Sequence, residues 1–114
     1  MLIAKCHKIS DRLRQDGGGR ARTRSKDAGD VIRLMLGEPT PAQIGARLAA
    51  LRHHPTAGAS VQVGMSYLRE LFGSPRSPGI ALAIDALAGA LPEKQIRALA
   101  PAFVAGVIES IRAA

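Results

Sequence analysis

Apolar residues recur at intervals of three and four along most of the chain, and this spacing constrains the fold more than any other feature. Leu2, Cys6, Ile9 and Leu13 begin the series, and five later segments repeat it. Such spacing predicts helices that each bury one face. Aromatic residues are few, with two Phe, one Tyr and no Trp, while alanine supplies 20 residues. This composition suits closely packed helices better than a β-sandwich or a β-barrel.

Turn and cap residues divide the chain into predicted elements. We expect helices over 2–14, 25–36, 41–52, 60–72, 78–91 and from 93 onward, with a basic loop over 15–24 and a linker over 73–78. Ser25 is the expected N-cap of the second helix, with Asp27 in its first turn, and Thr40 and Gln43 form a capping box before the third. Pro101 would either kink or split the last helix. The sequence thus predicts a single all-α domain over 1–114, a small bundle of about six helices.

Several protein classes are excluded at this level. The single cysteine, Cys6, rules out an internal disulfide framework and agrees with a reducing compartment. No apolar run approaches the roughly 18 residues that a transmembrane helix requires. The first residues lack the basic region and cleavage site of a signal peptide. We therefore expect a cytoplasmic protein with no membrane partner.

Positive charge is concentrated near the N-terminus. The chain carries a net charge of +7, and residues 1–36 hold nine Lys and Arg against four Asp. Clustered basic residues favour polyanions such as nucleic acid or nucleotide phosphates. Arg20, Arg22 and Arg24 alternate in the predicted loop and are the expected nucleic-acid-binding residues. The alternative is a solvated basic face that only aids solubility.

Common catalytic and metal motifs are missing from the sequence. Cys6 and His7 are adjacent, as are His53 and His54, so neither pair has the spacing of a metal site, and we expect no metal bound by this chain alone. Cys6 lies on an apolar stripe, which favours a place in the core. Gly17–Gly19 are followed by Arg20 and preceded by no strand, which favours a linker over a phosphate-binding loop.

A helix-turn-helix is the alternative basis for function. The helices expected over 42–51 and 60–72 could form such a DNA-reading pair. The turn between them is longer than usual, and the second helix would present mainly Gln62, Ser66 and Arg69. The alternative function is therefore a small basic nucleic-acid-binding protein, and a helical subunit that binds a partner protein is a third option.

Two segments carry a family resemblance. Residues 2–9 read Leu-Ile-Ala-Lys-Cys-His-Lys-Ile, and residues 26–34 read Lys-Asp-Ala-Gly-Asp-Val-Ile-Arg-Leu. In order, spacing and helical context they resemble the C-terminal part of the AbiEii-type nucleotidyltransferases, the toxins of type IV toxin–antitoxin systems. That family has a Leu-x-x-Lys helix, a variable basic loop and then an Arg/Lys-Asp-x-x-Asp helix. The resemblance is clearest over residues 2–36.

The resemblance implies roles for particular residues. Lys5, with Lys8 and Lys26, would bind nucleotide phosphates, and Asp27 and Asp30 would support the catalytic site. A complete relative would use Mg²⁺ and a nucleoside triphosphate to transfer a nucleotide to an acceptor such as RNA. In-line displacement at a phosphate is helped by cations on its oxygens, so these residue types suit that chemistry. The structural alternative is an exposed lysine that pairs with an aspartate on the next helix.

The chain departs from the family pattern in one respect. It contains no Asp-x-Asp motif, and therefore no Gly-Ser segment that leads into one, whereas these two features form the metal-binding part of such enzymes. We therefore expect a C-terminal helical fragment, from a truncated or split gene, that is inactive alone. An antitoxin or a separate N-terminal catalytic half would be its partner.

The sequence also gives an expectation for how far apart Lys5 and Asp27 lie. A simple antiparallel pairing of the first two helices would put Lys5 and Asp27 at opposite ends, so we expect no direct salt bridge between them. A shared site would then require the two helices to cross steeply.

Overall fold

The computed structural model describes residues 2–15, 21–37 and 40–113, without the side chains of residues 12–15 and 21–24. Within these ranges the regular secondary structure consists of six helices and no strand, and the all-α prediction is confirmed. The helices are α1 (Leu2–Gln15), α2 (Ala21–Leu36), α3 (Pro41–Leu51), α4 (Gly58–Phe72), α5 (Pro78–Ala86) and α6 (Glu93–Ala113). None of them combines the length and the apolar character needed to span a bilayer.

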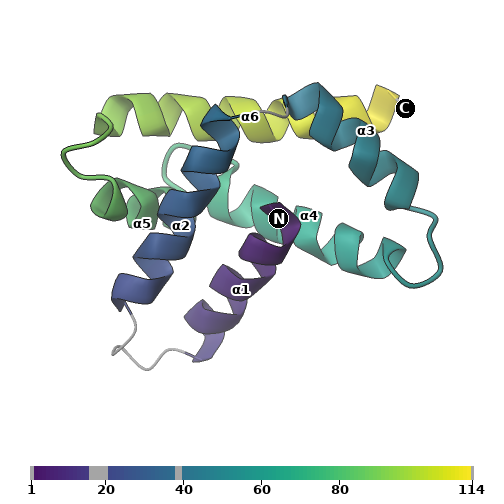
Figure 1. Ribbon diagram of the computed structural model, residues 1–114, viewed down its shortest axis with the longest axis horizontal. Coiled ribbons are helices and arrows are strands. Elements are labelled where there is room, and N and C mark those ends of the chain that lie inside the picture. Colours follow the sequence, from purple (N-terminus) through teal and green to yellow (C-terminus); the bar gives the residue numbers. More distant parts are fainter. Residues whose placement is uncertain (1, 16–20, 38–39, 114) are drawn as a thin grey trace.

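The helices pack mainly as pairs of elements that are distant in the sequence. α1 and α2 form an antiparallel hairpin, and α1 also lies against α4 (Figure 1). α2 packs most extensively on α5, and α3 on α6. The hairpin therefore packs against α4 through α1 and against α5 through α2.

One apolar core connects these pairs. The largest fully buried side chains come from five of the helices and are Cys6, Ile9, Val31, Ile32, Leu68, Phe72, Ile80, Ile96, Val104 and Val107. Full burial of side chains of this size contributes roughly 1.5–3 kcal/mol each. The placement of Cys6 in the core is as predicted, and its burial raises the pKa of the thiol to about 12.

Local cap chemistry predicted the start of α3 correctly. The Gln43 backbone N–H donates to Thr40 Oγ1 at 3.3 Å, and the Thr40 N–H donates to Gln43 Oε1 at 2.8 Å. Pro41 occupies the first helical position, where its missing N–H removes no intrahelical bond. The capping box is therefore formed in full.

Several predicted details of the helices differ from the structure. α2 begins at Ala21, so residues 21–24 of the predicted loop are helical and Asp27 lies in the second turn rather than the first. Ser25 is consequently an internal residue and not an N-cap. α5 ends at Ala86, because Gly89 adopts a φ of +85°, outside the helical region. α6 continues through Pro101 without a break.

Candidate functional site

Lys5 lies between the two aspartates of α2. Its Nζ donates a hydrogen bond to Asp30 Oδ2 at 3.1 Å and to Asp27 Oδ1 at 3.3 Å. The Lys5 side chain is 22% exposed, Asp30 27% and Asp27 only 4%. The structure therefore places a partly accessible ammonium over one buried and one half-buried carboxylate.

The helical hairpin explains this convergence. α1 ends at Gln15 and α2 begins at Ala21, so an antiparallel pairing brings residues near 5 opposite residues near 30. Asp27 and Asp30 are three residues apart and share a face of α2. The expectation of no direct salt bridge was wrong, because it placed the start of α2 four residues too late. Steep crossing of the helices is not required.

The surrounding charges fix Lys5 as a cation. The hydrogen bond that Lys5 donates to Asp30 is the largest cause that raises the pKa of Lys5 above its ordinary value of 10.5. Partial burial acts in the opposite direction, and the hydrogen bond and charge of Asp27 add to the increase. Lys5 is thus held in place and fully charged near neutral pH.

Further cations surround the two carboxylates. Lys8 Nζ lies 3.7 Å from Asp27 Oδ1, and Arg33 Nη1 lies 3.8 Å from Asp30 Oδ1. The Lys8 side chain is 49% exposed and that of Arg33 67%, so both are accessible to a ligand. Arg33 was not predicted as a site residue, although its position three residues after Asp30 was visible in the sequence.

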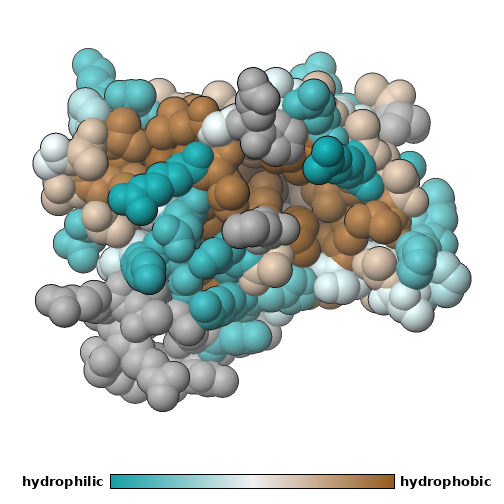
Figure 2. All heavy atoms as spheres, viewed as in Figure 1, coloured by the Kyte–Doolittle hydropathy of each residue, from teal (hydrophilic) through white to brown (hydrophobic). Residues whose placement is uncertain are grey.

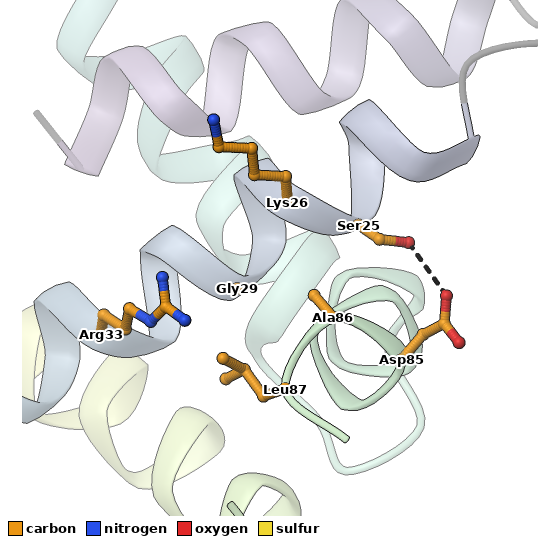
Figure 3. Close-up of a pocket in the computed structure, with 7 residues that line it drawn as sticks. All are labelled: Ser25, Lys26, Gly29, Arg33, Asp85, Ala86 and Leu87. Atoms are coloured by element: carbon orange, nitrogen blue, oxygen red, sulfur yellow. Dashed lines mark hydrogen bonds between the residues drawn. The ribbon is translucent and has the colours of Figure 1, made fainter. Parts of the chain in front are cut away.

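Lys26 lies on another side of α2, beside a hollow of about 500 Å³ between α2 and α5. Arg33 and Gly29 also line this hollow. In Figure 3 Lys26 extends away from α5, whereas the Ser25 hydroxyl points toward Asp85 and donates a hydrogen bond to its Oδ2 at 3.3 Å. No local sequence pattern linked Ser25 to Asp85, which are 60 residues apart. The structure therefore brings Lys5, Lys8, Asp27 and Asp30 together, whereas it places Lys26 along the hollow between α2 and α5.

The predicted nucleic-acid-binding arginines are only partly covered by the structure. Arg20 lies outside the described residues. Arg22 and Arg24 belong to the first turn of α2, but their side chains are likewise outside the described part of the chain. Their assignment stays a prediction.

The donor set around Asp27 and Asp30 does not fit Mg²⁺. Within the described residues, no group of three or more His, Cys, Asp or Glu side chains converges on one point. The space between the two carboxylates is taken by the Lys5 ammonium, and Arg33 approaches Asp30 from another direction. These residues are arranged to hold a lysine, and the metal implied by the family resemblance would need ligands from elsewhere.

His7 has a structural position between α1 and α4. Its Nε2 lies 3.0 Å from the Ser60 carbonyl oxygen, and its ring meets the edge of Tyr67 with the centroids 5.2 Å apart. These contacts fix the rotation of α1 against α4, and with it the direction in which Lys5 leaves the helix.

The helix-turn-helix alternative gains little from the structure. Six residues separate α3 from α4, as the sequence indicated, and the two helices make far fewer contacts with each other than α3 makes with α6 or α4 with α1. Gln62, Ser66 and Arg69 are exposed on α4. The pair is therefore not the compact unit that presents a recognition helix.

Comparisons of the chain with protein-family models, with curated proteins and with solved structures give no match.

Proposed function

We propose that this chain supplies the helical, phosphate-binding part of a nucleotidyltransferase-type site, as its resemblance to the AbiEii-type family implies. The observation that carries the proposal is the placement of Lys5 between Asp27 and Asp30. Lys5 is the residue that matches the family lysine, and the two aspartates match its Asp-x-x-Asp pair. Residues singled out as a motif from two separate segments thus lie in one cluster.

The cluster suits a polyphosphate. Lys5, Lys8 and Arg33 place three positive charges on or beside two carboxylates, which leaves an excess of positive charge, and Lys26 lines the hollow next to Arg33. An ammonium that is already oriented by carboxylates binds phosphate oxygens with little further loss of side-chain freedom. In this proposal Lys5 contacts the phosphates, and Asp27 and Asp30 keep its ammonium charged and in position.

The remainder of the catalytic site would come from elsewhere. The chain has no Asp-x-Asp motif, and its described donors do not fit a divalent metal. We assign the metal-binding half to a separate N-terminal catalytic segment, and the acceptor to RNA or another nucleic acid drawn by the basic residues 20–24. A cytoplasmic location accompanies this proposal, because nucleoside triphosphates are formed and used there.

A nucleotide-binding measurement separates this function from a purely structural ion pair. ATP is titrated into the isotope-labelled chain in metal-free, low-salt buffer, and amide shifts are followed by NMR. We expect shifts around residues 5–8 and 26–33, and an affinity about tenfold lower for Lys5→Gln, since one charge-assisted contact contributes roughly 1.5–3 kcal/mol. Inorganic triphosphate should compete with ATP, because the contacts are to phosphate.

Two matched variants make the result specific. Lys94→Gln removes an exposed lysine at the start of α6 and should leave ATP binding unchanged. Lys5→Arg keeps the charge and should retain part of the affinity. Equal affinity of the native chain and Lys5→Gln for ATP would contradict the proposal and leave Lys5 as a tie between two helices.

A further inference from the structure

Two hollows along α3 and α4 share two apolar lining residues, and together we refer to them as the groove. The larger has a volume of about 510 Å³ and extends to α1 and the end of α2, and the smaller has about 180 Å³ and reaches α6. Leu48 and Val61 line both hollows, so the two hollows adjoin at these side chains. Figure 2 shows apolar side chains gathered around a hollow on this face, between α1 and α3.

The walls of this groove are aliphatic. Ile3, Leu34, Ile44 and Leu51 line the larger hollow, and Leu51 remains 40% exposed at the end of α3. Exposed apolar surface that is both continuous and concave is typical of a binding site rather than of ordinary protein surface.

Four arginines border the groove, and we call it the arginine-rimmed groove. Arg47 lines the larger hollow, while Arg52, Arg69 and Arg112 line the smaller one. Among the residues that the structure describes, no Asp or Glu lines either hollow. The rim therefore carries charge of a single sign over an apolar floor, and its natural complement has an apolar stripe flanked by carboxylates.

We propose that the arginine-rimmed groove binds an acidic amphipathic helix of a partner protein. Its walls are helices, and the described part of the chain offers no strand edge, so the groove suits a docked helix rather than an added strand. Apolar residues spaced three and four apart would enter the two hollows over Leu48 and Val61. Glu or Asp residues beside that stripe would meet the four arginines.

The lining chemistry favours such a helix over nucleic acid. Arginines alone would attract phosphates, but the described lining residues include no Phe, Tyr, Trp or His side chain on which a base could stack. Burying phosphate against Leu48 and Val61 would also leave charged oxygens without partners.

A designed peptide provides the test. The probe is a fluorescein-labelled helical peptide with leucines at positions i, i+3, i+4 and i+7 and glutamates on both flanks of this stripe. A second peptide has the same composition in scrambled order, and a third has glutamine in place of glutamate. We expect binding of the first peptide, at least about tenfold weaker binding of the neutral peptide, and none of the scrambled one.

Variants of the chain locate the binding site. Leu51→Glu places a charge in the groove at an exposed position, and we expect it to weaken binding about tenfold or more. Val63→Glu is the matched control, since Val63 is 45% exposed on α4 but lines neither hollow, and it should bind as the native chain does. The double variant Arg47→Glu, Arg52→Glu should also lose affinity, while Arg76→Glu, outside the groove, should not.

Three outcomes would overturn the proposal. The first is equal binding of the ordered and the scrambled peptide, and the second is an equal effect of Leu51→Glu and Val63→Glu on peptide affinity. The third is that no peptide binds, whereas single-stranded RNA binds and its binding is lost when Arg47 and Arg52 are replaced by Glu. Lys5→Gln is expected to bind the acidic peptide normally, so failure here and failure of the proposed nucleotide site are read separately.

Discussion

At the scale of single residues, the Lys5 cluster (Lys5, Lys8, Asp27 and Asp30) joins α1 to α2. The contribution of each member to stability depends on how deeply its side chain is buried. The Asp27 side chain is 4% exposed and contacts both Lys5 and Lys8, whereas Asp30 is 27% exposed. A buried carboxylate is tolerated only when it is paired and hydrogen-bonded. The two aspartates therefore differ in their energetic roles, although they share a partner.

Asp27→Asn should destabilise the fold more than Asp30→Asn. Asparagine at 27 removes the charge from a buried hydrogen-bonding position and adds an amide group that needs its own acceptor, which costs roughly 1–3 kcal/mol. At position 30 the amide is still reached by water, and the expected cost is below about 1 kcal/mol. Urea unfolding of both variants measures the difference, and an equal or reversed order would contradict the role given to Asp27.

Lys5→Gln should show a pH-dependent loss of stability. The pKa of Lys5 is raised above 10.5, chiefly by its hydrogen bond to Asp30, so the lysine stabilises the folded state while it is protonated. This contribution is fully present below the unfolded pKa and disappears as pH rises through the higher folded pKa. At pH 7 we expect the unfolding free energy of Lys5→Gln to be about 1 kcal/mol lower than that of the native chain.

The same difference should shrink as the pH rises above 10.5. Unfolding by urea, followed by circular dichroism across this range, gives the comparison. Lys94→Gln should show no such trend, and a difference that grows with pH would contradict the assignment.

At the scale of helices, close approach of backbones determines how α1 is oriented. Gly64 is buried in the middle of α4, where glycine costs about 1 kcal/mol relative to alanine. A Cβ at this position would overlap Cγ2 of Ile3 and come within 3.2 Å of His7 Nε2. Gly64 therefore allows α1 to lie against α4 at the distance that places Lys5 opposite α2.

Gly64→Ala should destabilise the protein despite the gain in helix propensity. Overpacking costs about 1–3 kcal/mol and exceeds the roughly 1 kcal/mol that alanine contributes in an α-helix. At Gly37 a Cβ would make ordinary contacts, the nearest at 3.7 Å to the Arg33 carbonyl oxygen, so Gly37→Ala should be close to neutral. Thermal unfolding of the two variants tests this, and equal melting temperatures would contradict it.

Local chemistry predicted most elements, and long-range contacts account for the differences. Thr40 and Gln43 form a cap within one turn, so sequence alone was sufficient to place α3. Ser25 resembled a cap, but it lies inside α2, 6% exposed, and bonds to Asp85 on α5. That partner is invisible to any local pattern, and the error shifted the predicted position of Asp27 and hid its contact with Lys5.

The arginines of segment 15–24 allow a direct test of polyanion binding. Neutralising Arg20, Arg22 and Arg24 together should weaken RNA binding, and the slope of log affinity against log salt should flatten by roughly 0.7 per lost phosphate contact on a single strand. Fluorescence anisotropy at several salt concentrations measures the slope. Unchanged binding would make these arginines a solubilising feature only.

Replacing Gln62 and Arg69 instead should leave the RNA affinity and its sequence preference unchanged, and a changed preference would support the helix-turn-helix alternative.

At the scale of the whole molecule, the chain has two separate candidate binding sites. One is the hairpin of α1 and α2, and the other is the arginine-rimmed groove. We propose an anion with several phosphates as the ligand of the Lys5 cluster and an apolar helix stripe with acidic flanks as the ligand of the groove. Net charge of +7 would speed the approach of either ligand. Two such sites are consistent with the proposal that another polypeptide supplies the metal-binding half of the site.

The last prediction follows from the proposal that this chain holds only part of a catalytic site. Residues 1–114, incubated with Mg²⁺, RNA and a labelled nucleoside triphosphate, should transfer no nucleotide. Phosphoryl and nucleotidyl transfer depend on positioned groups that offset charge on both the attacking and the leaving oxygen. Lys5 and its neighbours supply cations for the phosphates, but the sequence has no Asp-x-Asp pair, and the Asp27 and Asp30 carboxylates are engaged by Lys5. Labelled RNA separated by gel electrophoresis provides the measurement, with loss of product in Lys5→Gln as the control for a contaminating enzyme. Transfer by the native chain that Lys5→Gln abolishes would show that these helices hold a complete site, and would refute the assignment of the metal-binding half to another segment.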